Sequence, residues 1–162
     1  MFKINDTVVH YRDGIAIITG TTLMAGNEYF VLNVKRVGNV SVYVPVSKAD
    51  NIIRDVLSID QADELLRYAK EIPESFIGNT KQRRDDFKRK LASGDIKDVA
   101  FLTKMYLLHK TNSFETENVK LGQMDVEMLK DAYNRLTDEF AVIYDVTHEN
   151  IEEFMVNKLK LI

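Results

Sequence analysis

The stretch Val40–Gln61, VSVYVPVSKADNIIRDVLSIDQ, decides the fold because the spacing of its apolar residues changes along it. Between Val40 and Val44 every second residue is a valine, which is the pattern of a strand with one buried face. Pro45 ends this strand because it has no N–H to donate to a sheet. At the other end, Ser58 with Gln61 three residues later forms a capping-box pattern that begins a helix. The chain therefore changes from strands to helices within this stretch.

The residues before this stretch read as further strands. Short runs rich in β-branched and aromatic residues are separated by glycine-containing turn signals at 13–14, 25–27 and 38–39. No helical pattern lies between them, so they predict a small, strongly bent sheet or an open barrel. The expected strands are Thr7–Val9, Ile15–Ile18, Tyr29–Val34 and Val40–Val44.

The residues after Ser58 read as helices that can form a bundle. Stop and cap signals divide them, and the apolar residues from Val126 to Ile143 recur three and four apart. Residues 111–122 read as a loop. Five helices are expected. The first begins at Ser58 and stops by Pro73, and the second runs from Lys81 to Ala92. The third follows the cap Asp95, the fourth spans Val126–Ile143, and the fifth follows the cap Thr147. The sequence thus predicts an α+β chain with a β module over 1–57 and an all-α helical domain over 58–162.

Composition places the chain in an ordinary class. It has 162 residues, of which 45% are apolar and 29% charged, and a net charge of −3. It has no apolar run of the roughly 20 residues that span a bilayer, and Asp6 interrupts any secretory signal. Zero cysteine excludes disulfides, thiolate nucleophiles and cysteine-based zinc sites. We therefore expect a cytoplasmic protein that has no membrane partner.

A basic segment stands out within this acidic chain. Lys81–Asp95, KQRRDDFKRKLASGD, carries six cationic side chains, and the longer range Lys81–Lys110 has nine Lys or Arg against four Asp. That range carries +5, which leaves −8 on the remainder. The asymmetry indicates a docking face for an anionic partner such as DNA phosphate. A solvated helix face is the alternative, and Phe87 within it either anchors the helix to its neighbours or reaches a nucleic-acid groove.

The sequence shows no catalytic pattern. His10, His109 and His148 lie in different expected elements and read as surface or turn residues. The paired carboxylates lie in polar sequence, whereas an acid/base pair needs an apolar setting to separate its pKa values. Metal-binding, nucleophile-elbow and phosphate-loop motifs are missing. We therefore expect a protein that is not an enzyme, with no metal, cofactor or small-molecule substrate.

Several segments resemble the CarD/CdnL family of bacterial transcription regulators. The resemblance covers nearly the whole chain in order, and the first part alone also resembles the polymerase-binding module of the transcription-repair coupling factor. The matching segments are FKINDTVV with Asp13-Gly14, then EYFVL from Glu28, VYVP from Val42 with Arg54-Asp55-Val56, R-x-x-x-F-K-x-x-L-A-S-G-D from Arg83, and Leu129, Ala132, Leu136, Glu139 and Ala141.

The resemblance implies a Tudor-like N-terminal domain that docks on the β subunit of RNA polymerase, and a helical domain that contacts promoter DNA. Such proteins stabilise the open complex, so the chain would associate with the nucleoid through polymerase. Carried to this sequence, the polymerase-binding residues are Tyr29, Val31, Val40, Val42 and Tyr43, and the DNA-binding residues are Lys81, Arg83, Arg84 and Lys88.

The chain also departs from the family pattern. The tryptophan that wedges into the minor groove in well-known members is replaced by Thr80, one basic position falls on Asp85, and Tyr43 stands where some members are basic. A wedge contributes by bending DNA, so its loss leaves contacts to phosphates that are weaker and more salt-sensitive. Two alternatives remain: a module that binds polymerase or another partner without contacting DNA, and a small enzyme with no recognisable motif.

Overall fold

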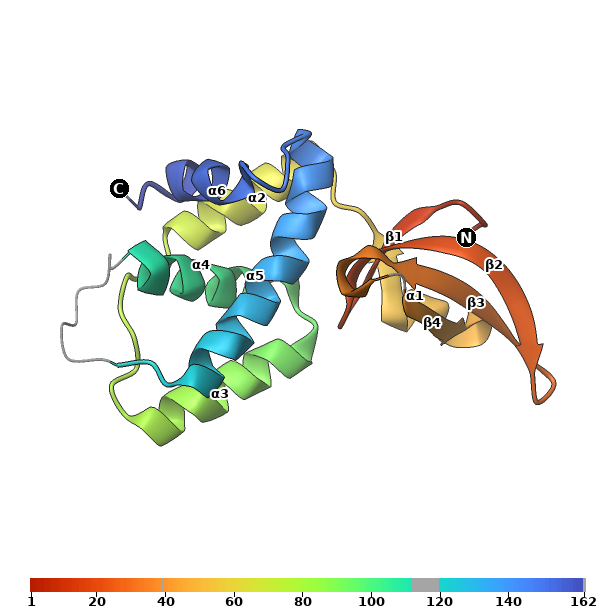
Figure 1. Cartoon of the computed structure of the whole chain (residues 1–162), viewed down its shortest axis with the longest axis horizontal. Coiled ribbons are helices and arrows are strands. Elements are labelled where there is room, and N and C mark those ends of the chain that lie inside the picture. The colour runs from red at the N-terminus through yellow and green to blue at the C-terminus, as the bar shows by residue number, and fades with distance from the viewer. Residues whose placement is uncertain (39, 112–119, 162) are drawn as a thin grey trace. The chain divides into compact units, whose positions relative to one another are not determined.

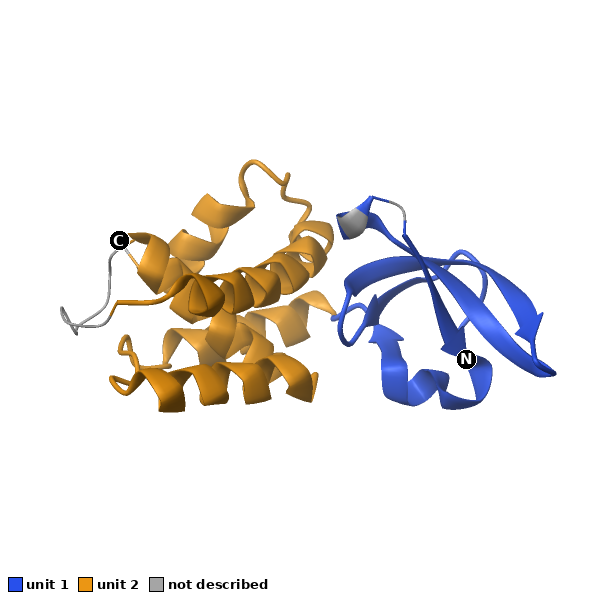
Figure 2. Ribbon diagram, turned by 60° about the horizontal axis from the view of Figure 1, so that its bottom comes forward, with its two compact units in different colours: residues 1–57 blue, residues 58–162 orange. Residues whose placement is uncertain are grey.

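The structure, a computed structural model, describes residues 1–38, 40–111 and 120–161. The chain divides into two compact units, Met1–Leu57 and Ser58–Ile162 (Figure 2). The first unit carries the strands and the second is helical, so the predicted α+β class is confirmed. Most of the predicted loop over 111–122 lies outside the described residues.

The first unit is built on one antiparallel sheet of five strands in the order β4-β3-β2-β1-β5, which does not close into a barrel. The short strand β5 is missing from the sequence prediction because three residues carry too little pattern to show a period. It pairs with β1, where Val8 lies opposite Asp55. The strands are β1 (Thr7–His10), β2 (Gly14–Met24), β3 (Asn27–Val34), β4 (Val40–Pro45) and β5 (Ile53–Asp55).

Local sequence explains the shape of this sheet. The β2–β3 hairpin turns at Ala25 and Gly26, whose φ angles of 49° and 79° match the twist of the two strands. A register shift between Ile18 and Gly20 interrupts the β2–β3 pairing and lets β2 bend (Figure 1). One sheet face buries the core of this unit. That core consists of Val8, Ala16, Ile18, Phe30, Leu32, Val34, Val44, Ala49 and Ile53.

Short helical segments connect the last strands. Two 3-10 turns, Lys35–Val37 and Val46–Lys48, flank β4, and helix α1 (Ala49–Ile52) precedes β5. Pro45 is the last residue of β4, as the sequence predicts. These connections bring Ala49 and Ile53 onto the core face of the sheet.

The second unit contains five helices over its described residues, and α5 packs against α3, α4 and α6 (Figure 1). Its core side chains are fully buried at Leu129, Leu136 and Phe140, in the three-and-four spacing that the sequence shows. The helices are α2 (Ile59–Lys70), α3 (Thr80–Ser93), α4 (Ile96–Thr111), α5 (Gln123–Tyr144) and α6 (Ile151–Leu159). No helix over the described residues is long and apolar enough to cross a bilayer.

The capping predictions have mixed outcomes. The capping box at Ser58 and Gln61 is present, with both reciprocal hydrogen bonds formed. The Asp95 carboxylate accepts a hydrogen bond from the Lys97 N–H at 2.8 Å, as expected of a cap. Thr147 was the wrong cap for the last helix. Its carbonyl instead closes a turn with the Asn150 N–H, and α6 begins after that turn.

Candidate polymerase-docking strand and candidate nucleic-acid interface

Strands β3 and β4 carry the five residues predicted to bind polymerase. Val31 lies directly opposite Tyr43, and Tyr29 is two residues from Val31, so these three side chains lie on one face of the sheet. Tyr43 is 50% exposed, and the other two are partly exposed. Asn33 continues the same row, and its side-chain oxygen is buried without a hydrogen bond to any described residue. This face combines two tyrosines with an unsatisfied acceptor.

The remaining two predicted residues lie on the opposite face. Val40 pairs with Val34 and Val42 with Leu32, and both partners are fully buried. Val42 packs against the core, whereas Val40 is 48% exposed. The five residues therefore do not form one sheet face, because neighbours along a strand alternate sides. Three of the five lie on the edge strand β4, and Tyr29 and Val31 lie on β3 beside it.

Helix α3 holds the residues predicted to contact DNA. Asn79 caps it by accepting a hydrogen bond from the Gln82 N–H, and Gly94 ends it in the left-handed region with a φ of 71°. Phe87 is 2% exposed, which settles its role as an anchor in the core of the unit. Arg83, one helical turn earlier on the same side, is also 2% exposed.

The buried guanidinium of Arg83 is held by protein groups. It lies 3.3 Å from the carboxylate of Asp125, which is fully buried in the first turn of α5. It also donates to the carbonyl of Ile77 at 2.9 Å and to that of Lys120 at 3.3 Å. A side chain with these partners has no surface to offer to phosphate. The prediction that Arg83 contacts DNA is therefore corrected, because the sequence reveals the charge but not the burial.

Arg84 shares the same carboxylate. Its Nε lies 3.5 Å from the second oxygen of Asp125, and its side chain is 35% exposed. Asp125 thus lies between two guanidinium groups and ties the start of α3 to the start of α5. Because a buried carboxylate needs compensating charge, Arg84 acts first as a structural partner and presents only part of its side chain to solvent.

Two later cations of α3, Arg89 and Lys90, are also paired. Asp86 accepts hydrogen bonds from both Arg89 and Lys90, one turn further along the helix. The Lys90 ammonium additionally lies 4.6 Å from the ring centroid of Phe101. These contacts lower the positive field that the residue count alone suggests.

Lys81 and Lys88 are the predicted DNA-binding residues that α3 leaves exposed. Neither forms an ion pair with a residue in the described part of the chain. They lie seven residues apart on one side of the helix, and the exposed Asp85 lies between them. The solvent-facing charge of this helix is consequently much smaller than its composition indicates.

The three histidines lie in different surroundings. His10 was expected at the surface or in a turn, but it is 7% exposed. Its Nδ1 accepts hydrogen bonds from the N–H groups of Arg12 and Asp13, so it fixes the turn between β1 and β2. His148 is exposed and His109 is partly buried. Over the described residues, no cluster of His, Asp and Glu could hold a metal ion.

Sequence reasoning missed Asp125 and a second set of cations. Asp125 carries a signal, since an acid in the first turn of a helix complements the helix dipole, but nothing in the sequence connects it to Arg83. The missed cations lie on α2 and α6, where Arg67, Lys70 and Lys158 line one cleft. They are far apart in the chain, so only the packing of the two helices reveals that they are neighbours.

Comparison with known families covers almost the whole chain. The model described as "CarD-like/TRCF RID domain" matches residues 2–57, and the model described as "CarD, C-terminal domain" matches residues 64–156. A protein of Bacillus subtilis (strain 168) named "Putative transcription factor YdeB" is 25% identical over 162 residues, which cover 95% of this chain and 99% of that protein. Both parts of the family pattern occur here in order. The chain therefore belongs to the CarD family.

Proposed function

We propose that this protein regulates transcription by docking on the β subunit of RNA polymerase through its first unit, while its helical unit contacts promoter DNA and stabilises the open complex. Family membership supports a role in transcription regulation and an interaction with polymerase. The observation that carries the proposal is the pair of family models, because they match the sheet unit and the helical unit in order. The proposal assigns no catalytic step.

The docking surface in this proposal is the edge strand β4 with the adjoining face of β3. An edge strand offers backbone N–H and carbonyl groups to a strand of a partner. Tyr43 and Tyr29 add apolar area on the partly exposed face of the two strands. A strand of the β subunit pairing along this edge would use all of these groups.

Binding of purified RNA polymerase to the full-length chain tests the docking step. Tyr43→Glu places a charge on the exposed face of β4 and is expected to weaken binding at least tenfold, because charges are disfavoured in the core of an interface. Val142→Glu, at a side chain 56% exposed on α5, is the matched control and should bind as the wild type does. Equal binding by the two variants would reject β4 as the docking edge.

The DNA contact in this proposal uses Lys81 and Lys88 with the exposed part of Arg84. The charge reversal Arg83→Glu is unsuitable as a test, since it would place a second carboxylate against Asp125 and report on folding. We instead expect Lys81→Glu/Lys88→Glu to shorten the lifetime of promoter open complexes formed with purified polymerase. The difference should shrink as salt rises, because phosphate contacts are screened.

The matched control is Lys48→Glu/Lys130→Glu, which makes the same charge change at two exposed lysines outside α3.

A second candidate function is a module that binds polymerase and does not contact DNA. It is favoured because Asp125 and Asp86 form ion pairs with most cations of α3. Open-complex lifetimes that are the same for the wild type and for Lys81→Glu/Lys88→Glu would select that function.

A further inference from the structure

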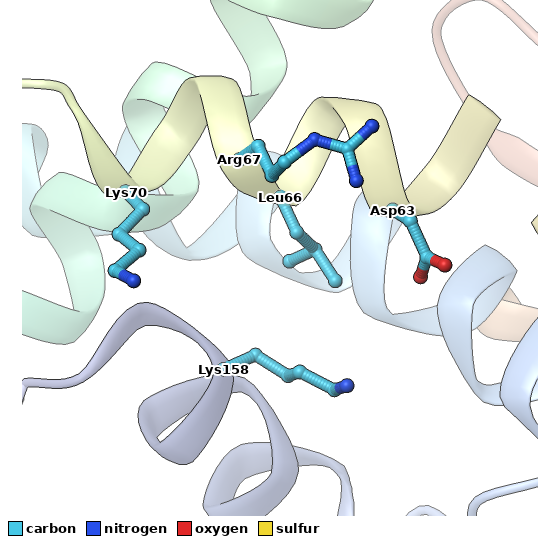
Figure 3. A pocket seen from close by; sticks show the side chains of 5 residues that line it. All are labelled: Asp63, Leu66, Arg67, Lys70 and Lys158. Carbon is cyan, nitrogen blue, oxygen red and sulfur yellow. The ribbon is translucent and has the colours of Figure 1, made fainter. Parts of the chain in front are cut away.

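Helices α2 and α6 flank an open cleft of about 290 Å³ within the helical unit. This volume is just below the usual range of small-molecule sites, which is about 300–1,000 Å³, so it suits a small ligand. Figure 3 shows its lining side chains: Asp63, Leu66, Arg67 and Lys70 from α2, and Lys158 from α6. The family resemblance assigns no role to these residues.

The cleft is cationic on both walls. Lys70 extends from α2 toward α6, and Lys158 extends along α6 beneath Leu66, while Arg67 lies along α2 on the Asp63 side (Figure 3). All three cations are exposed, and none forms an ion pair with any residue that the structure describes. The Lys158 ammonium lies 5.5 Å from the ring centroid of Phe154, which restrains its stem beside the cleft. The cleft therefore has three cations available to bind an anion.

One carboxylate, Asp63, lies at the far end of the cleft from Lys70 (Figure 3). One of its oxygens accepts a hydrogen bond from the Tyr144 hydroxyl at 2.6 Å, which fixes its position. The other oxygen has no hydrogen bond to a described residue and can accept one from a ligand hydroxyl or amine. The lining thus has an anion-binding end and an acceptor end, with the apolar side chain of Leu66 between them.

We propose that this cleft binds a small phosphorylated ligand of the nucleotide class. Its phosphates would lie between Lys70 and Lys158, and a sugar or base donor would bind Asp63. Cations that reach an anion from two sides suit phosphate oxygens, which accept several charge-assisted hydrogen bonds. The ligand is bound and not transformed, so the proposal requires no catalytic group.

The surroundings of the cleft favour a small ligand over DNA. Exposed acids lie on or directly after the same two helices outside the lining: Glu64 on α2, Glu71 at its end and Glu153 on α6. An extended polyanion laid across α2 and α6 would meet these carboxylates, whereas a small ligand meets only the lining side chains. Charge repulsion therefore selects against DNA at this face.

Calorimetric titration of the full-length chain tests the proposal with ADP, pyrophosphate and adenosine as probes. We expect saturable binding of ADP, weaker binding of pyrophosphate, and none of adenosine. Lys70→Ala/Lys158→Ala should weaken ADP binding by roughly tenfold or more, since two charge-assisted contacts are lost. Asp63→Asn should strengthen pyrophosphate binding by removing a like charge, which a merely structural effect of the substitution would not do.

The control Lys48→Ala/Lys130→Ala removes the same charge at exposed lysines that do not line the cleft, and it should bind ADP like the wild type. Absence of saturable ADP binding, or equal loss in the control, would overturn the proposal. So would a result in which a DNA duplex, and neither ADP nor pyrophosphate, depends on Lys70 and Lys158. These outcomes are independent of polymerase docking, because no polymerase is present.

Discussion

At the scale of single residues, the contact with the largest consequence joins Arg83 to Asp125. Both side chains are almost completely buried, and the carboxylate also lies close to Arg84. Burying a charge is costly unless an opposite charge compensates it, so removal of one partner leaves the other charge buried and uncompensated. It fixes the beginning of α3 against the beginning of α5 and thereby sets the orientation in which α3 presents Lys81 and Lys88 to solvent.

Removing one partner should therefore be strongly destabilising. Asp125→Asn leaves the Arg83 guanidinium buried beside a neutral amide and is expected to lower the free energy of unfolding by about 3–5 kcal/mol. Urea denaturation followed by circular dichroism measures this. Asp85→Asn makes the same charge change at an exposed position of α3 and should stay within about 0.5 kcal/mol of the wild type. Similar losses for both would mean that the buried pair is not a major stabilising contact.

Lys104 is a second buried cation, and its partners are backbone carbonyls instead of a carboxylate. Its side chain is fully buried, and its ammonium donates to the carbonyls of Lys70 and Ile72 at the end of α2. Desolvation lowers the pKa of Lys104, although the charges of Glu74 and Glu71 oppose the shift. The contact completes the end of α2, where the last carbonyls of a helix have no partner within it.

Replacement of Lys104 should show the value of that contact. Lys104→Met keeps the apolar stem but leaves two carbonyls without their donor, so we expect a loss of about 1–3 kcal/mol in the free energy of unfolding at neutral pH. The depressed pKa sets the sign of the pH dependence. Between the folded pKa and 10.5 the unfolded chain binds more protons, so the advantage of the wild type should grow as pH rises. A difference that shrinks over this interval in urea titrations would contradict the assignment.

At the scale of elements, α5 carries two partly buried tyrosines, Tyr133 and Tyr144, whose pKa values are raised. Burial raises the pKa of Tyr133, and the charge of Glu152 adds to the shift. Burial also raises the pKa of Tyr144, and its hydrogen bond to Asp63 contributes further. The ring centroids of Tyr133 and Tyr106 lie 4.7 Å apart, and those of Tyr144 and Phe154 lie 4.9 Å apart. Both residues join α5 to its neighbours.

These shifts predict alkaline destabilisation of the helical unit. Above about pH 10 the unfolded chain loses tyrosine protons that the folded chain retains, so stability is lost as pH rises through that value. The slope is at most about 1.4 kcal/mol per pH unit for each tyrosine, and smaller where solvent screens the group. In urea titrations between pH 9 and 11, Tyr133→Phe/Tyr144→Phe should flatten the decline. An unchanged slope in this double variant would assign the decline to other groups.

At the scale of the whole molecule, each unit has a core of its own. The sheet unit buries Leu32, Val34 and Val44 on one face, while the helical unit buries Leu129, Leu136 and Phe140. Apolar burial is the main favourable term in folding, so separate cores make the two units separate sources of stability. In the proposed function this arrangement lets one unit bind polymerase and the other bind DNA, with tethering raising the local concentration of the second site.

Separate cores predict that damage stays within one unit. Leu32→Ala removes a fully buried side chain of β3 and should destabilise the sheet unit by about 2–5 kcal/mol. Hydrogen exchange of the full-length chain, followed by mass spectrometry, should then show lost protection within 1–57 and unchanged protection within 58–162. Leu129→Ala should give the reverse pattern. Loss of protection in both units from either substitution would show that they unfold together.

The amino-acid sequence alone predicts the fold class and most helices and strands, because apolar period, caps and turn residues act over a few neighbouring positions. The capping box at Ser58 and the stop at Gly94 are local signals that the structure reproduces. The alternation of Val40–Val44 is reproduced only in part, since Val44 is buried and Val40 is 48% exposed. The order of the segments also sufficed to identify the family. The three-residue strand β5 was too short to carry such a signal.

Which charges are free to bind a partner becomes visible once the folded chain is known. A run of cations reads as a basic face, but burial and ion pairing depend on residues distant in the chain, as Asp125 shows for Arg83 across 42 positions. The sequence does not reveal the cleft for the same reason, because its cations come from α2 and α6, the first and last helices of the unit along the chain. The charge of a side chain follows from the residue type, whereas its ability to bind a partner depends on how the folded chain packs around it.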